Sequence, residues 1–192
     1  MKKLLLLLGL LANLALAAPI PEEMVRNTSK DVVDILKKEK NDRKAREQVQ
    51  ARVLPSFDFG RMTALAVGRH WRGASPDQRT QLTDEFRQLL VRTYSSALTT
   101  YKAQAVDVKP LKIDDAATDV TVLTEVAVAN QQPVSINYSL RKTEQGWKVY
   151  DVVVAGISLV TNYREQFGQE VRNGGIDGLI QTIASKNKSL EA

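Results

Sequence analysis

The spacing of apolar positions changes along this chain, and the changes divide it into three parts. Between residues 21 and 101, apolar side chains recur every three or four positions, the spacing of one helix face. Between residues 105 and 154 the pattern is that of strands: apolar and polar residues alternate over 119–129 and 134–141, as in strands with one buried face, and 147–154 is apolar on both faces. From residue 158 to 188 the helical spacing returns. The pattern predicts helices before and after an antiparallel sheet, which is the α+β class.

The first part predicts four helices, and the fourth has the clearest start signal. Ser75 is a favourable N-cap, Pro76 suits the first helical turn, and Gln78 stands where a capping box needs it. The four helices are predicted over residues 21–40, 43–54, 57–67 and 75–101.

The middle part predicts a meander of about four antiparallel strands. The strands are expected over residues 105–113, 119–129, 134–141 and 147–154. Residues 130–132 form the first predicted turn, and Gly146 supplies the positive φ of the second. A three-residue turn would set Val126 opposite Ile136 and Val122 opposite Leu140.

The third part predicts two helices, over residues 158–172 and 176–186. Between them, the stretch Asn-Gly-Gly at 173–175 is a strong helix stop signal.

The first 17 residues have the pattern of a secretory signal peptide. Lys2 and Lys3 precede a Leu-rich run that is too short to span a bilayer, and small residues at 15 and 17 suit cleavage after Ala17. The remaining residues, 18–192, have the length of one domain with its own core. The chain has no Cys, which excludes disulfides, thiolate chemistry and a lipid anchor on an N-terminal Cys. The simplest location is therefore the periplasm.

Charge adds little to this picture. Without the leader, 25 basic side chains face 22 acidic ones, an excess of three. Such a small excess could favour contact with an anionic lipid surface, but ordinary surface charge is the better explanation. Basic clusters interleaved with aromatic residues are missing from the sequence, so nucleic-acid binding is not expected.

Catalytic and metal-binding signatures are missing from the sequence as well. His70 is the only His and has no nucleophile motif beside it. Asp114, Asp115 and Asp119 lack the spacing of an EF-hand loop, and the glycines at 174–178 lack the Lys of a phosphate loop. No metal or cofactor is predicted.

Asp151 is the acid with the strongest claim to a function. It lies inside an apolar strand, where an unpaired carboxylate would cost several kcal/mol. It is therefore a paired structural group, a group that faces solvent at the edge of the sheet, or a general base. The turn at Gly146 leaves open which face of the strand it occupies.

Five segments together resemble one known family. They are residues 57–63 (FDFGRMT), 71–79 (WRGASPDQR), 85–94 (EFRQLLVRTY), 147–152 (WKVYDV) and 156–164 (GISLVTNYR). In order and spacing they resemble the MlaC family of toluene-tolerance auxiliary proteins, over about residues 21–187. Members of this family are periplasmic phospholipid carriers.

The resemblance implies a fold, a cargo and partners. The fold would be a cone formed by a curved sheet, like that of nuclear transport factor-like proteins, with extra N-terminal helices and an internal lipid cavity. The cargo would be phospholipid, without catalysis. The partners would be an outer-membrane lipoprotein–porin complex and an inner-membrane ABC transporter with a ring of lipid-binding domains, and the role would be maintenance of outer-membrane lipid asymmetry.

The resemblance also implies that part of the apolar interior is hollow. We expect the cavity between one sheet face and the inner stripe of the helix that follows Ser75, closed on one side by the helix after residue 158. The expected lipid-binding residues are Leu89, Leu90, Tyr94, Leu98, Val122, Val126, Ile136, Tyr138, Leu140, Val160, Tyr163 and Phe167.

Two other functions stay open at this point. One is an isomerase-like enzyme of the same cone fold that uses Asp151 as its base. The other is a periplasmic interaction module with a solid core and no ligand.

Overall fold

The computed structural model of this chain describes residues 20–100, 103–114, 116–129 and 132–190, without the side chains of residues 96–100 and 103. The predicted leader and part of the predicted turn at 130–132 lie outside these ranges. The helices are α1 (Pro21–Lys38), α2 (Asp42–Val53), α3 (Phe59–Val67), α4 (Pro76–Thr100) and α5 (Leu159–Ser189), with 3₁₀ turns η1 (Leu54–Ser56) and η2 (Gly68–Gly73). The strands are β1 (Ala103–Val108), β2 (Asp119–Val128), β3 (Val134–Thr143), β4 (Gly146–Val154) and β5 (Ile157–Ser158).

The signal at the start of α4 forms as predicted. The Ser75 N–H donates to Gln78 Oε1 at 2.9 Å, and the Gln78 N–H donates to Ser75 Oγ at 3.2 Å. This reciprocal capping box satisfies donors that the first turn of the helix leaves free.

Helix α3 begins two residues later than predicted. The Asp58 carboxylate accepts the Arg61 N–H at 2.8 Å and so caps the helix at Phe59. Phe57 is extended instead and forms a parallel bridge with Val149 of β4. The predicted helix start was wrong because a long-range strand contact takes Phe57 out of the helix.

Helix α5 changes direction where the Gly-rich stop signal was found. Gly175 has φ 67° and ψ −170°, and helical residues continue on both sides of it. The predicted break is therefore confirmed as a kink between two helical segments.

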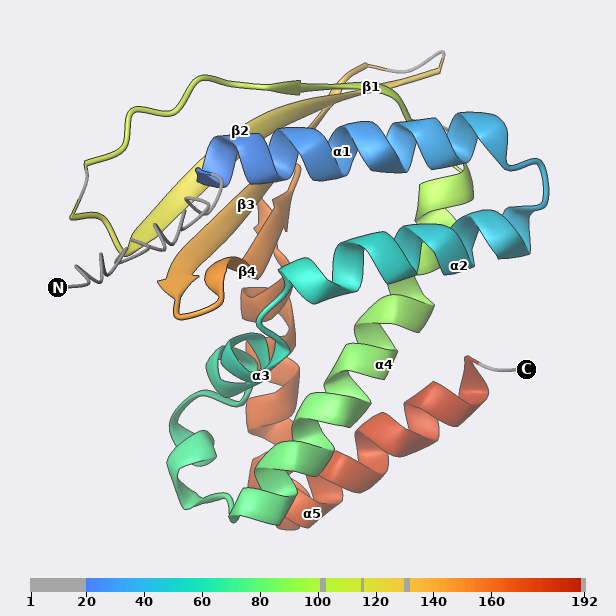
Figure 1. The fold of residues 1–192 in the computed structure, drawn as a ribbon. Helices are drawn as coiled ribbons and strands as arrows, with labels where there is room; N and C mark the ends of the chain where they lie inside the picture. The colour runs from blue at the N-terminus through green and yellow to red at the C-terminus, as the bar shows by residue number, and fades with distance from the viewer. Residues whose placement is uncertain (1–19, 101–102, 115, 130–131, 191–192) are drawn as a thin grey trace, which may run out of the picture.

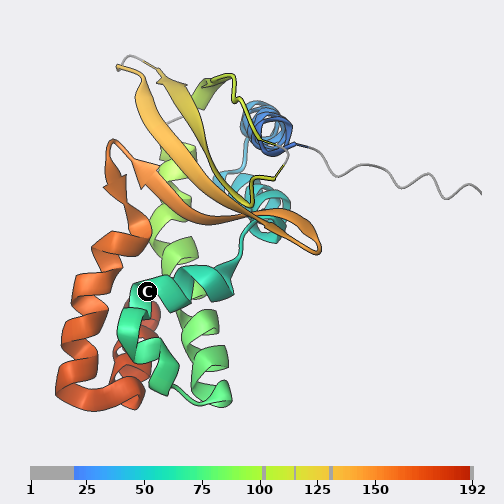
Figure 2. The ribbon, with the colours of Figure 1, turned by 90° about the vertical axis from the view of Figure 1, so that its left-hand side faces the viewer.

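The predicted α+β class is confirmed, with one strand more than expected. In the described part of the chain, the antiparallel sheet has the order β1-β2-β3-β4-β5, and it curves strongly (Figure 2). The extra strand, β5, has only two residues and pairs with Val153 and Val154 at the end of β4. Gly146 has φ 94°, as the turn before β4 was predicted to require.

The predicted register of β2 and β3 was wrong by two residues. Val126 pairs with Val134 and Val122 pairs with Tyr138, and the ladder between the two strands ends at the pair Val126–Val134. Pro133, which directly precedes Val134, has no N–H to donate to a ladder. A shift of two residues leaves every side chain on its predicted face, so the apolar face of the sheet is unchanged.

Two further strand details differ from the prediction. β1 ends at Val108 instead of residue 113, because Pro110 cannot donate a ladder hydrogen bond. In β4 the pairing skips Tyr150, since Ser139 pairs with Asp151 and Leu140 with Val149. This β-bulge places Val149 and Val152 on the same side of the sheet although they are three residues apart.

The elements form two connected regions (Figures 1 and 2). Helices α3, α4 and α5 pack against one another at one end, and α1 and α2 lie beside the sheet at the other, while α4 extends from the helical end toward the sheet. We call the buried cluster at the first end the helical core. It consists of Met62, Ala66, Val67, Leu82, Phe86, Leu89, Leu90, Val160, Tyr163, Phe167, Leu179 and Ile183.

Candidate functional site: an apolar cavity

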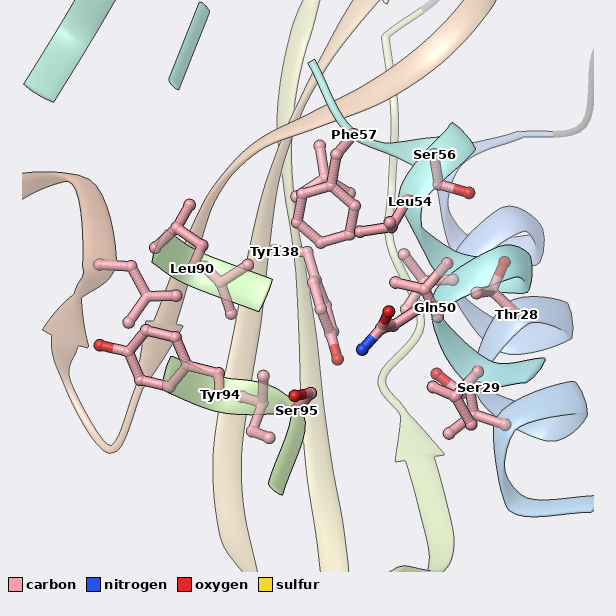
Figure 3. A pocket seen from close by; sticks show the side chains of 18 of the residues that line it. Thr28, Ser29, Gln50, Leu54, Ser56, Phe57, Leu90, Tyr94, Ser95 and Tyr138 are labelled. Atoms are coloured by element: carbon pink, nitrogen blue, oxygen red, sulfur yellow. The ribbon is translucent and has the colours of Figure 1, made fainter. Parts of the chain in front are cut away.

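A cavity of about 320 Å³ lies between α1, α2, α4 and one face of the sheet. Its volume falls within the range of about 300–1,000 Å³ that ligand sites occupy. Figure 3 shows side chains from α1 and α2 on one side, from α4 on another, and Tyr138 of β3 between them. The lining residues are Met24, Val25, Thr28, Ser29, Val32, Val33, Val49, Gln50, Val53, Leu54, Ser56, Phe57, Phe59, Met62, Leu90, Val91, Tyr94, Ser95, Val106, Val126, Ile136, Tyr138, Val149, Val152, Val154 and Leu159.

Local structure brings these residues to one space. In α1 the lining residues recur at the spacing of one helix face, and α2 contributes Val49 and Val53, which are four residues apart. In the strands alternate residues line the cavity, as Ile136 and Tyr138 do in β3. The bulge at Tyr150 adds both Val149 and Val152 of β4.

The lining is apolar with a few neutral polar groups. Among the described residues that form it, none carries a charged side chain. Burial raises the pKa of the Tyr138 hydroxyl to about 12, so this group is neutral at physiological pH. Such a surface favours hydrocarbon and disfavours ions, because an unpaired charge would lose its hydration there.

Polar contacts outside the cavity fix the position of α1 and α2. The Arg52 guanidinium of α2 lies 2.6 Å from the Asp31 carboxylate of α1. The Arg26 side chain donates to the Val108 carbonyl at 2.9 Å, and the Glu22 carboxylate accepts the Leu111 N–H at 2.9 Å. The hydrogen bond from Arg26, together with that from the Leu111 backbone, lowers the pKa of Glu22. These contacts join the two helices to each other and to the β1 edge.

Five of the residues expected at the site line the cavity: Leu90, Tyr94, Val126, Ile136 and Tyr138. Four others, Leu89, Val160, Tyr163 and Phe167, lie in the helical core. Val122 and Leu140 lie in a second buried cluster, which strands of the sheet form together with Val25 of α1. The side chain of Leu98 lies outside the described part of the structure.

Comparison with known proteins decides the family. A model of the family described as MlaC protein matches residues 26–185. The chain belongs to the MlaC family. The resemblance predicted from the sequence is thereby confirmed.

Two relatives of this MlaC family member carry descriptive names. The chain is 30% identical over 186 residues to toluene tolerance protein ttg2D of Pseudomonas putida, which covers 94% of this chain and 86% of that protein. It is 26% identical over 131 residues to the intermembrane phospholipid transport system binding protein MlaC of Haemophilus influenzae, covering 67% of this chain and 61% of that protein.

A solved structure has the same fold. The phospholipid-binding protein of Ralstonia solanacearum, determined in complex with a phospholipid, is 34% identical and superposes with a TM-score of 0.80. The match covers 89% of this chain and 98% of that one.

Sequence reasoning missed the wall that α1 and α2 contribute to the cavity of this MlaC family member. The signal was present, because Met24, Val25, Thr28 and Val32 mark one face of the predicted first helix. That face was not assigned to the cavity, since an amphipathic stripe identifies a buried side without identifying its partner. The missed residues include Ser29, Val33, Val49, Gln50 and Val53.

Asp151 is hydrogen-bonded at the junction of β4 and α5. Its carboxylate accepts the Ser158 hydroxyl at 2.6 Å, the Val160 N–H at 3.1 Å and its neighbour's N–H, that of Val152, at 2.8 Å. Ser158 in turn caps α5 by accepting the Thr161 N–H at 3.0 Å. Asp151 is also missing from the cavity lining. This geometry is that of a structural group that orients the start of α5.

The described part of the chain contains neither a cluster of metal-ligating side chains nor a membrane-spanning helix. In residues 20–100, 103–114, 116–129 and 132–190, no three His, Cys, Asp or Glu side chains lie close enough together to hold a metal ion. Within the same ranges, no helix combines the length and the apolar character needed to cross a membrane.

Proposed function

We propose that this chain is a soluble periplasmic phospholipid carrier. The observation that carries the proposal is the cavity of about 320 Å³ whose described lining has no charged side chain. The relatives add to it, since one is named as a phospholipid transport binding protein and another was solved with a phospholipid bound.

The thermodynamics of acyl chains explain why a carrier needs such a cavity. Each methylene is worth about 0.8 kcal/mol in transfer, so two chains with roughly 30 methylenes would cost on the order of 20 kcal/mol to expose to water. An apolar cavity removes most of that cost. Because a membrane offers the tails a similar environment, transfer is nearly neutral, and its direction must come from partners.

The proposal assigns the tails to the lining residues. Leu90, Tyr94, Val126, Ile136 and Tyr138 are proposed to contact acyl chain, together with the α1 and α2 residues opposite them. Lipid contact at the predicted residues outside the lining, and at Leu98, stays a prediction. Contact with these residues would require the cavity to expand toward them when lipid binds.

The cellular setting follows from the predicted leader and the family. The leader, residues 1–17, would direct the chain to the periplasm. There it would receive or deliver lipid at an outer-membrane lipoprotein–porin complex and at an inner-membrane ABC transporter with a lipid-binding ring. Its role would be to maintain outer-membrane lipid asymmetry.

The enzyme alternative is weaker. An isomerase-like reaction would need Asp151 as a free base beside the cavity, whereas its carboxylate accepts three hydrogen bonds at the start of α5. We therefore propose that the protein has no catalytic activity and no cofactor, and that bound phospholipid is its cargo.

The head group is expected to stay near solvent. A phosphate inside the cavity would need a buried cationic clamp, and the described lining has none. Phosphatidylethanolamine and phosphatidylglycerol of equal chain length should then bind within about tenfold of each other, roughly 1.4 kcal/mol.

The test is to purify the protein from cells, extract it with organic solvent and analyse the extract by mass spectrometry. We expect phospholipid in amounts comparable to the protein, and rebinding after delipidation. A protein that carries no lipid and binds none from vesicles would contradict the proposal and leave the interaction module. A turnover that disappears in Asp151→Asn would instead establish the enzyme.

A further inference from the structure

Two neutral polar side chains meet inside the apolar cavity. Gln50 extends from α2 and Tyr138 from β3, and in Figure 3 the amide of Gln50 and the hydroxyl of Tyr138 point toward one another. Neither group forms a hydrogen bond with a protein group in the part of the chain that the structure describes. Both groups border the cavity, so their hydrogen-bonding capacity is directed to whatever fills it.

The apolar surroundings of this pair favour a ligand that forms hydrogen bonds with it. A hydroxyl or amide removed from water without a new hydrogen bond is destabilised, because it loses its hydrogen bonds to water. Burial raises the pKa of Tyr138 to about 12, so its O–H keeps its proton and acts as a donor. A ligand that accepts from these groups is therefore favoured over one that leaves them unpaired.

The chemistry of the pair selects a neutral acceptor. Phosphate or carboxylate would bring a charge into a lining that, in its described residues, has no cation to pair with it. An ester carbonyl is neutral, accepts hydrogen bonds and sits at the head of each acyl chain. Tyr138 O–H and the Gln50 N–H groups are suitable donors for it.

We propose that Gln50 and Tyr138 form a recognition site for the ester carbonyl groups of a diacyl lipid. This inference rests on the proposed function and adds a selection rule, namely that ester-linked lipids bind better than ether-linked lipids of the same shape. The pair also orients the cargo. In the view of Figure 3, Ser95 and Ser29 lie on the side to which the Tyr138 hydroxyl points, and Phe57, Leu54 and Ser56 lie on the opposite side. Because the hydroxyl points toward Ser95 and Ser29, the glycerol end belongs on that side and the tail ends toward Phe57.

The experiment compares diester and diether phosphatidylcholine of equal chain length, each titrated into delipidated protein. The diester should bind about tenfold more tightly, which corresponds to about 1.4 kcal/mol and to the loss of one or two ordinary hydrogen bonds. Tyr138→Phe and Gln50→Met keep the side-chain volumes nearly constant and should each reduce the ratio, and the double variant should bring it close to one.

Tyr94→Phe is the matched control. Tyr94 also lines the cavity, but its hydroxyl points away from Tyr138 and Gln50 in Figure 3, so its loss should leave the ratio unchanged. Circular dichroism and the thermal midpoint of the delipidated variants check that each is folded.

An infrared measurement tests wild-type protein directly. Lipid labelled with ¹³C at the ester carbonyls should show a carbonyl band at lower wavenumber when bound than in dry organic solvent, as hydrogen bonding requires. The shift should diminish in the variants that fold.

The outcomes separate the two proposals. If neither lipid binds, the proposed function fails. If both bind equally to wild type, if the ratio survives in the double variant, or if the bound carbonyl band matches that in dry solvent, the carrier stands and the ester site is overturned. Equal binding would also indicate that water, rather than lipid, satisfies the pair.

Discussion

The two regions of this molecule bury similar apolar side chains, but in one region these side chains pack against each other and in the other they surround a cavity. In the helical core Phe86 lies 5.1 Å from both Tyr163 and Phe167, ring centroid to centroid, in edge-to-face contacts at 76° and 74°. In the cavity region Val, Leu, Phe and Tyr side chains face a space of about 320 Å³. Met62 and Leu90 belong to both, since they are buried in the helical core and also line the cavity.

The contrast shows that a hydrophobic pattern in the sequence specifies which side chains are buried, but not how densely they are packed. Three helices can approach along their lengths, and their side chains interdigitate as in most protein interiors. A curved sheet faced by α1, α2 and α4 leaves a volume that its own side chains do not fill. One region therefore provides stability, and the other provides space for a ligand.

The largest expected effect comes from the same truncation made on both sides of this boundary. Leu82 and Leu90 lie eight residues apart on α4, and both are buried, but only Leu90 borders the cavity. Leu82→Ala should cost about 2–5 kcal/mol of unfolding free energy, because it leaves a void in a packed core. Leu90→Ala should cost less, by about 1–2 kcal/mol, since part of its surface faces space already. Urea denaturation of delipidated protein measures both. Equal costs would mean that the apo cavity collapses around Leu90.

The next prediction concerns Asp151, at the junction of β4 and α5 that connects the two regions. Asp151→Asn keeps one acceptor but replaces the other with an NH₂ group that faces donors. Hydrogen bonds to charged groups are worth about 1.5–3 kcal/mol, so the variant should lose about that much stability. Lipid recovered per folded protein should stay within about twofold of wild type. A large loss of lipid without loss of stability would show that Asp151 acts on the ligand.

Replacing a buried residue with a larger one should lower stability more in the helical core than in the cavity region. Ala66 is fully buried in the helical core, and Ala66→Leu should cost about 1–3 kcal/mol through overpacking. Val126→Trp adds more volume, but the ring can enter the cavity, so the delipidated protein should lose less than about 1 kcal/mol while lipid loading falls several-fold. The thermal midpoint and the lipid recovered from cells are measured together. If Val126→Trp folds and loads lipid normally, Val126 lies outside the lipid site.

The effect that is smallest near neutral pH becomes measurable only at high pH. Burial raises the pKa of Tyr138, and burial with the nearby Tyr94 raises that of Tyr163, each to about 12. Because both pKa values lie above the ordinary tyrosine value of about 10, the folded state holds these protons more tightly than the unfolded state. The resulting stability is complete below about pH 10 and is lost as the pH rises toward 12.

Bound lipid should raise the pKa of Tyr138 but not that of Tyr163. Filling the cavity with acyl chain removes the remaining water from Tyr138, whereas Tyr163 does not line the cavity and reaches it only through its neighbour Tyr94. Absorbance titration at 295 nm should therefore show a lipid-dependent increase in one tyrosine pKa, which Tyr138→Phe removes. If the increase persists in that variant, it comes from another tyrosine.

Much of the fold follows from the sequence, because its determinants are local. The capping box at Ser75 and Gln78, the positive φ of Gly146 and the kink at Gly175 depend on residues within a few positions of each other. The spacing of apolar residues and the capping and turn residues predicted the helices, the order of the strands and the buried faces of β2 and β3. A family resemblance supplied the cargo, which no local pattern contains.

Only the tertiary structure decided which buried faces enclose the cavity. The long-range contact of Phe57 with Val149, the bulge at Tyr150 and the two-residue shift between β2 and β3 depend on segments far apart in the sequence. The meeting of Gln50 with Tyr138 depends on them as well, since α2 and β3 come together only when the chain folds. Amphipathic spacing shows that a residue is buried. Whether it faces another side chain or an empty volume depends on how curved and straight elements fit together, and spacing alone carries no information about that fit.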